Sequence, residues 1–466
     1  MNDIASTLGY GVPMDTSVVV NRTTKLYHFL HDEYNPTDVA TCTFPTGADY
    51  VDTRRSFLTF ELNTVSGGVV KYGFGTHGSV CNTIKRVCVY ARSGEELCRM
   101  EEFNLFSNMM LPFTYNRQWF QRQGNGMWYG SRIFNTKQTC VIPMYILSPL
   151  FNSNQLLPAA LVSGMRVELT LEDHNKVTFA VNTTTNVPNT TTTIYSLSGM
   201  TFHLETVKLA DGIQMAMDEL MATKGVEMVY KGWHHAFTAP RHDMTNGVEL
   251  SISESYARAL SAFARVRPES HEVKAFNVHE DPERDSFRGE HIFPISDYQW
   301  RCGDRFYPDK PVTAKGGRII IKSLMHTLNA TNQLDGTRDQ SYASLLGDYN
   351  MPDITSGLMS GNADAGTGET WPGFFPAFPG KTGSYARDGH IIGVDLTRDS
   401  DNGFSGRPVN NVDRFTLSLT GNNNSLEFTA DSQETLLDGP PNRRLDLFLE
   451  YAKLVRIFTN NVQVEK

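Results

Sequence analysis

The chain has 466 residues, a formal net charge of -9 and 20% charged residues, and this length exceeds one ordinary core and suggests two or three domains. The acidic balance excludes a protein that coats nucleic acid by neutralising phosphate, because that function needs a basic surface. The 27 Phe and 18 Tyr, beside 37 Gly and 21 Pro, favour strands joined by turns over helices.

The cysteines show neither a CxxC motif nor any zinc-site spacing, which favours buried, reduced thiols in an intracellular product over a disulfide framework. They are Cys42, Cys81, Cys88, Cys98, Cys140 and Cys302. The N-terminus has no basic segment followed by a continuous apolar one, so we expect no secretory signal there. The uncharged run 140–165 contains prolines that make a lipid-exposed helix costly, so we expect no membrane span there.

Alternation of apolar and polar residues recurs along the chain and predicts strands. In the segment 56–63 it places Leu58, Phe60 and Leu62 on one face. Clusters of Gly, Pro and Asn separate such segments where a βαβ fold would have regular helices, so that fold is disfavoured. The same alternation predicts further strands at 83–91, 139–147, 165–172, 200–209, 227–237, 391–396 and 413–419.

Helical patterns are few, and two long segments are typical of surface loops. Helices are expected at 94–110, 212–225 and 339–350, of which the second lies near the midpoint and would link two domains. The segment 182–193 is polar and of low complexity, as in an exposed loop tip. The segment 356–389 is rich in Gly with aromatic clusters, so we expect an excursion that touches a neighbour.

The sequence repeats itself weakly at a nearly constant offset. "LETVKL" (204–209) and "LEYAKL" (449–454) share Leu, Glu, Lys and Leu at identical spacing, 245 residues apart. "MRVELTL" (165–171) and "DRFTLSL" (413–419) share Arg, Leu and Leu, 248 residues apart. Because the order of the matches is preserved, they favour a duplicated β unit over chance similarity between amphipathic strands, which is the alternative.

The motifs that usually carry chemistry are weak here. "GFGTHG" (73–78) matches GxGxxG, but a strand-like segment follows it where a dinucleotide site needs a helix N-terminus, and "PGKT" (379–382) lacks the earlier glycine of a P-loop. The charged run 280–291 alternates in sign, as solvated loops do. Four possible metal ligands are close in sequence, but adjacent histidines on a strand point to opposite faces, which disfavours a shared site. These four are His234, His235, His242 and Asp243.

The stretch "YQWRCGDRFYPDKPV" (298–312) alternates large and polar side chains and then reaches Pro308 and Pro311, as a half-buried strand entering an exposed corner does. It resembles the strand and corner in the second barrel of double jelly-roll major capsid proteins of double-stranded DNA viruses, particularly those of polinton-like viruses, adintoviruses and virophages. Three further segments are similar to that family in the right order, namely 49–63, 151–173 and 445–466.

The resemblance implies an all-β fold of two tandem eight-stranded jelly rolls with a few short helices. An N-terminal arm would span 1–25, the first jelly roll 26–210, a linker helix 211–225, and the second jelly roll 226–466 with an insertion at 356–389. In the second barrel, Tyr307, Pro308 and Pro311 would shape a structural corner, and 356–389 would lie at a trimer contact or form a tower. No catalytic, cofactor-binding or metal-binding residue is expected.

The implied function is that of a major capsid protein in a virion. In the family, three chains form a pseudo-hexameric capsomer that tiles an icosahedral shell, so the expected partners are two further copies, neighbouring capsomers, and penton and minor capsid proteins. Neither an enzymatic activity, a cofactor nor sequence-specific nucleic-acid binding is implied. The virus group, the host compartment of assembly and an underlying membrane stay open.

Two other classes remain as alternatives. A β-sandwich that binds or acts on carbohydrate would also be rich in aromatic residues and Gly loops, and it predicts convergent carboxylates or an aromatic platform together with a secretory signal. A cytosolic binding module predicts a stable monomer.

Overall fold

The structure is a computed structural model. Among the residues that it describes, no helix is long and apolar enough to cross a membrane. The described residues are 18–45, 47, 49–65, 70–74, 79–115, 119, 122, 124–128, 137–153, 155–177, 179–182, 188–189, 194–239, 247–268, 295–313, 391–397, 406–410, 413–421, 443–459 and 461–465.

The N-terminal part of the chain forms two facing antiparallel sheets, which we call the first barrel. One sheet has the order β1 (Val19–His28), β12 (Ile194–Leu209), β4 (Tyr50–Val65), β8 (Lys137–Pro143), with β2 (Glu33–Tyr34) also paired to β12. The other has the order β3 (Val39–Thr43), β9 (Arg166–Leu171), β6 (Ile84–Tyr90), β7 (Glu96–Met100). A small sheet joins β11 (Pro188–Asn189), β10 (Phe179–Asn182) and β5 (Val70–Gly73).

The C-terminal part, the second barrel, repeats this arrangement. One sheet has the order β13 (Val226–Phe237), β21 (Arg443–Ile457), β15 (Tyr256–Pro268), β18 (Ile391–Asp395), with β19 (Arg407–Val409) on β15 and β22 (Val462–Glu465) on β21. The other has the order β14 (Val248–Ile252), β20 (Phe415–Gly421), β16 (Ile295–Cys302), β17 (Arg305–Thr313). The strand order matches the first barrel strand for strand, so the fold is two tandem jelly rolls, as the sequence predicts.

The sequence repeats fall on counterpart strands. "LETVKL" lies in β12 and "LEYAKL" in β21, the second strand of corresponding sheets, while "MRVELTL" and "DRFTLSL" lie in β9 and β20. The strand pairing agrees as well, because Lys208 of β12 pairs with Asn21 of β1 and Lys453 of β21 pairs with Tyr230 of β13, the first strands of the two barrels. The duplication in the sequence thus coincides with a duplication of the strand order.

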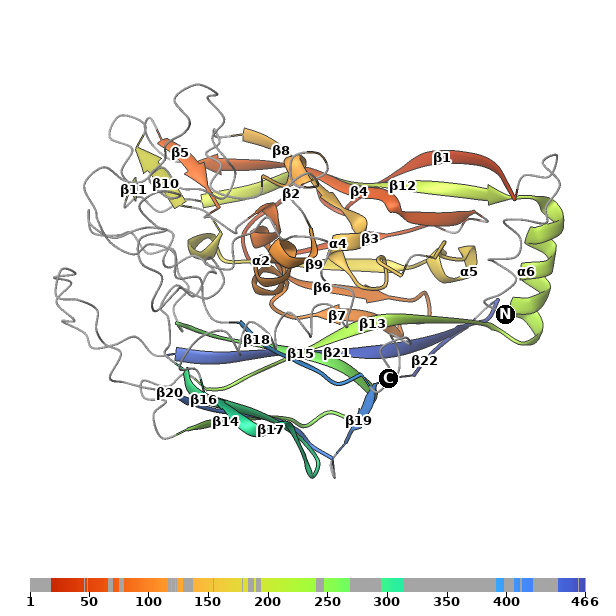
Figure 1. Cartoon of the computed structure of the whole chain (residues 1–466). Helices are drawn as coiled ribbons and strands as arrows, with labels where there is room; N and C mark the ends of the chain where they lie inside the picture. Colours follow the sequence, from red (N-terminus) through yellow and green to blue (C-terminus); the bar gives the residue numbers. More distant parts are fainter. Residues whose placement is uncertain are drawn as a thin grey trace, which may run out of the picture.

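The layers stack in one direction (Figure 1). The sheet of β1 and β12 is outermost, followed by the sheet of β6 and β7, then the sheet of β13 and β21, and finally the sheet of β16 and β17. The two barrels thus meet with different faces: the second sheet of the first barrel packs against the first sheet of the second barrel.

The strand connections differ in length between the two ends of the barrels. We call the end where β1 and β13 begin the terminal end. Short connections join strands there, at 44–49, 91–95, 253–255 and 303–304. We call the opposite end the loop end. Long connections join strands there, at 238–247, 269–294, 314–390 and 422–442. Of the loops expected from the sequence, 182–193 lies largely and 356–389 wholly outside the described residues.

Helix α6 (Asp211–Thr223) connects the barrels along the terminal end (Figure 1). Its 13 residues span roughly 20 Å at about 1.5 Å per residue, which matches two sheet spacings of about 10 Å each and so carries the chain from the first layer to the third. The helix stops at Gly225, which has a φ of 77° and packs against the Phe458 ring.

The remaining helices with described bounds are short, and one expectation about them is wrong. They are α2 (Phe103–Thr114), α4 (Met144–Leu147), α5 (Ala159–Val162), η1 (Val80–Thr83), η2 (Gly124–Met127) and η3 (His174–Lys176). The pattern at 94–110 predicts a single helix, but its first part is strand β7, because a turn at Gly94 (φ 87°) folds Glu96–Met100 back onto β6. The pattern at 339–350 lies outside the described residues.

The start of the chain also differs from expectation. Strand β1 begins at Val19, within the segment 1–25 expected to be an arm, because residues up to His28 pair with β12. Residues 1–17 are outside the described part of the chain.

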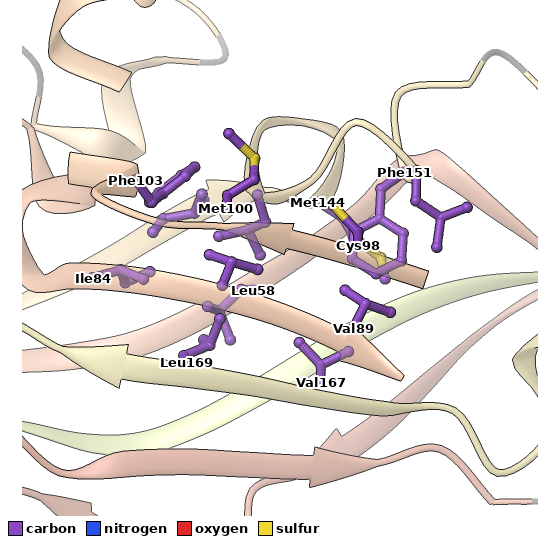
Figure 2. Close-up of a cluster of buried hydrophobic side chains, with 14 of the residues drawn as sticks. Leu58, Ile84, Val89, Cys98, Met100, Phe103, Met144, Phe151, Val167 and Leu169 are labelled. Carbon is purple, nitrogen blue, oxygen red and sulfur yellow. The ribbon is translucent and has the colours of Figure 1, made fainter. Parts of the chain in front are cut away.

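Alternation places apolar side chains between the sheets of each barrel. Leu58, Phe60 and Leu62 of β4 are at most 1% exposed, as their spacing predicts. Figure 2 shows Leu58 beside Leu169 and Ile84, which come from β9 and β6 of the facing sheet. Hydrophobic burial of this kind, at about 25 cal/mol per Å², is the main stabilising contribution in each barrel.

All six cysteines are buried and free. Burial raises the pKa of Cys42, Cys81 and Cys140 to about 12 and that of Cys98 to about 11. Because these thiols stay protonated in the fold, their contribution to stability is complete below about pH 9, the ordinary thiol value, and is lost as the pH rises toward 12.

We expect the native chain to react with a thiol reagent at neutral pH at least about a hundredfold more slowly than the chain unfolded in denaturant, since the reactive thiolate is absent and shielded. The absorbance of released thionitrobenzoate measures both rates. Rapid reaction of one equivalent in the native chain would contradict this prediction.

Candidate functional site

The histidines that the sequence brings together do not form a shared site. His235 directs Nε2 to Asp446 Oδ1 at 2.8 Å, whereas His234 Nδ1 lies 3.6 Å from Glu254 Oε2. The His234 ring packs against Tyr256, a residue distant from Asp446 across the sheet. Adjacent positions on β13 thus face different neighbours, as expected. His242 and Asp243 lie outside the described residues, and among those described no group of three or more potential metal ligands is found.

The other sequence motifs contribute no site to the described part of the chain. Gly73 ends β5 and Phe74 is buried, while residues 75–78 of "GFGTHG" lie outside the described residues. The same holds for "PGKT" at 379–382 and for the charged run 280–291.

The most elaborate arrangement of side chains lies where the barrels meet, and we call it the seam. Its apolar centre is Phe106 of α2, whose ring centroid is 4.7 Å from that of Trp233 and 5.4 Å from that of Phe448. The Trp233 ring also contacts Phe263 of β15, with 5.9 Å between the ring centroids. Aromatic contacts of this geometry add about 0.5–1.5 kcal/mol each to the burial of their area.

A buried lysine crosses the seam. Lys453 of β21 is 2% exposed, and its Nζ donates to the main-chain oxygens of Glu96 at 3.0 Å and Leu97 at 2.6 Å, the first two residues of β7. The Tyr230 hydroxyl, from the strand beside Lys453, donates to the same Leu97 oxygen. Burial holds the pKa of Tyr230 well above its ordinary value, so this hydroxyl remains a donor.

A buried carboxylate organises a second polar group at the loop side of the seam. Asp446 is fully buried, accepts a hydrogen bond from His235 Nε2 at 2.8 Å and forms an ion pair with Arg444 at 3.0 Å. The Arg444 guanidinium lies 3.7 Å over the Phe237 ring and 3.9 Å from Glu102 of the first barrel. Charged groups that are buried away from water need such partners, because burying an unpaired charge costs free energy of solvation.

Tyr307, Pro308 and Pro311 lie together in β17, the outermost strand of its sheet. The pairing with β16 jumps between Tyr298–Val312 and Trp300–Tyr307, so residues 308–311 bulge from the ladder. A bulge on an edge strand tolerates proline, which has no N–H to donate.

One side chain closes this bulge. Gln299 Nε2 donates to the main-chain oxygens of Pro308 at 3.2 Å and Asp309 at 3.3 Å, and the Arg407 guanidinium lies 5.0 Å from the Tyr307 ring centroid. The role of Tyr307, Pro308 and Pro311 as a corner of the barrel stays a prediction. The hairpin that contains them exposes Phe306, which is 44% accessible.

Sequence reasoning missed the polar residues of the seam. Lys453 and Asp446 stand in an apolar strand, where single charges usually indicate a solvent-exposed face. The sequence feature that could have revealed them is "LDLFLEYAKL" (445–454), in which apolar residues occupy both odd and even positions. This pattern indicates a strand covered on both faces.

No family model and no curated protein matches the sequence. Solved structures do match over nearly the whole chain. PBCV-1 VP54, fitted into a reconstruction of the virophage Sputnik, has a TM-score of 0.60 at 8% identity, covering 98% of this chain and 99% of that one. The Faustovirus major capsid protein has a TM-score of 0.53 at 8% identity, covering 98% and 94%. The Sputnik virophage structure has a TM-score of 0.52 at 10% identity, covering 97% and 90%. At these identities the similarity shows the fold, the double jelly roll.

Proposed function

We propose that this chain is the major capsid protein of a double-stranded DNA virus and that three copies form a pseudo-hexameric capsomer. The observation that carries the proposal is the contact between the barrels. Two barrels of equal topology meet through different faces, so in the described part of the chain no further layer covers the outer sheet of β1 and β12 or the opposite outer sheet of β16 and β17. Repetition of such a head-to-tail contact generates a ring or a filament.

The compared structures support closure into a shell. Two of the three are described as a major capsid protein and as a protein fitted into a virophage reconstruction. With two barrels per chain, three chains supply six barrels, which gives the hexagonal outline that tiles an icosahedral surface. The location is then the virion, and penton and minor capsid proteins are expected partners. The carbohydrate-binding alternative has weaker support, since these structures belong to capsids and not to enzymes.

The orientation follows from the two ends of the barrels. The long connections join strands at the loop end, whereas α6 and the start of β1 lie at the terminal end (Figure 1). Long loops tolerate variation and carry contacts, so we place the loop end on the outside of the shell and the terminal end on the inside. In this proposal residues 1–17 are an inner arm, and the segment 356–389 forms a tower or a contact between copies.

Light scattering across the size-exclusion peak tests the proposal. We expect a particle near three times the chain mass of 52.2 kDa, with a hexagonal outline in negative-stain images, or larger shells. A stable monomer at micromolar concentration would contradict it and would favour a binding module.

A further inference from the structure

The repeat that joins the two barrels also predicts a contact between copies. Lys453 is buried in the seam and donates to carbonyl groups at the start of β7. Its counterpart by sequence and register is Lys208, which occupies the same position in the repeat "LETVKL" and pairs with the strand equivalent to β13. Lys208 is exposed, and among the residues that the structure describes no further strand or helix covers the outer sheet of the first barrel at this point.

The acceptor side of the seam has a counterpart as well. Strand β7 is the outermost strand of its sheet, and β17 takes that place in the second barrel. The start of β17, with Asp304 just before it and Arg305 and Phe306 as its first residues, is exposed. These residues offer main-chain oxygens and the Asp304 carboxylate to a cation.

Resting on the proposed function, we propose that Lys208 is the intermolecular equivalent of Lys453: its ammonium group donates to residues 304–306 at the start of β17 in a second copy of this chain. The contact continues an interface that already exists inside the molecule, with the same two kinds of strand. It also covers apolar side chains left exposed on the two faces, Leu26 (53%) and Val20 (61%) of β1 and Phe306 (44%) of β17.

Cross-linking tests the position of the contact. In the double variant Lys208→Cys with Asp304→Cys, a short bis-maleimide is expected to convert most of the assembled chain into covalent dimers and trimers on a denaturing gel. A bis-maleimide is preferable to a disulfide, which needs Cα atoms within about 7 Å, because a lysine reaches further. The native cysteines contribute little background, since all six are buried.

The matched controls separate this contact from others. Lys137 stands on β8, the strand of the same outer sheet furthest from β1, with its Nζ 2.6 Å from Glu61. Lys137→Cys with Asp304→Cys is expected to yield no trimers, and Lys208→Cys alone is expected to yield no dimers. Efficient linking by the single variant would indicate a two-fold contact and would overturn the inference.

A second measurement addresses the energy of the contact. We expect Lys208→Met to raise the concentration at which half of the assembly dissociates by at least about tenfold, because each contact loses one charge-assisted hydrogen bond. Lys137→Met is expected to change this concentration by less than about twofold. Circular dichroism of each variant confirms folding. If trimers form and neither Lys208 variant shows its effect, this contact is wrong and the proposed function stands. If the unmodified chain is a monomer, both are wrong.

Discussion

Replacing Lys453 with Met is expected to lower the free energy of unfolding by about 3 kcal/mol. Methionine keeps most of the side-chain volume, so the decrease in the free energy of unfolding measures the contribution of the polar contacts. The Lys453 ammonium group donates to the main-chain oxygens of Glu96 and Leu97 across the seam, where Lys453 and Leu97 are at most 2% exposed, and only the Tyr230 hydroxyl remains as a donor to the Leu97 oxygen once the ammonium group is gone. Hydrogen bonds to charged groups contribute about 1.5–3 kcal/mol each.

The measurement is urea unfolding followed by tryptophan fluorescence, with all chains at one concentration so that assembly contributes equally. The matched control is Lys137→Met, the same substitution at a lysine of the first barrel whose ion pair with Glu61 is exposed to solvent, and it is expected to change the unfolding free energy by less than about 1 kcal/mol. A weakened seam would also separate the unfolding of the two barrels into two transitions. Equal effects of the two substitutions would show that aromatic packing around Phe106 alone holds the barrels together.

Replacing Asp446 with Ala is expected to cost still more, about 3–5 kcal/mol, because it leaves the buried groups of His235 and Arg444 without their common acceptor. Asp446 is fully buried, and its contacts to these two residues are 2.8 Å and 3.0 Å. The Glu102 carboxylate, 3.9 Å from Arg444, is too distant to replace it.

The control for this prediction is an exposed ion pair that joins strands of the same sheet. Glu227 of β13 accepts from Arg456 of β21 at 2.7 Å, and its side chain is 55% exposed. Glu227→Ala is expected to change stability by about 0–1 kcal/mol, since solvent screens the pair and can replace either partner. Thermal and urea unfolding compare the two variants. A similar small loss for Asp446→Ala would show that the cluster relaxes toward water and is not a rigid part of the seam.

Helix α2 and strand β7 mark where local patterns were insufficient. The residues 94–110 have helical spacing of apolar side chains, and only part of them is helical, because the turn at Gly94 allows Glu96–Met100 to pair with β6. Pairing with β6 satisfies part of the backbone groups of this edge segment, and Lys453 and Tyr230 donate to two of its oxygens; together these contacts override a weak local preference. The helix at 212–225 was predictable, since few tertiary contacts compete for it: only Met221 is buried.

The sequence by itself determined the all-β class, most of the strands and the duplication, because alternation and the repeat at 204–209 and 449–454 are local properties of the chain. Only the tertiary structure decided that Lys453 is buried while Lys208 is exposed, although both occupy the same position in the repeat. The difference comes from residues 356 positions away in sequence, the carbonyl groups of β7, which cover one lysine and not the other. Burial of a charge depends on such distant partners, and no local pattern records them.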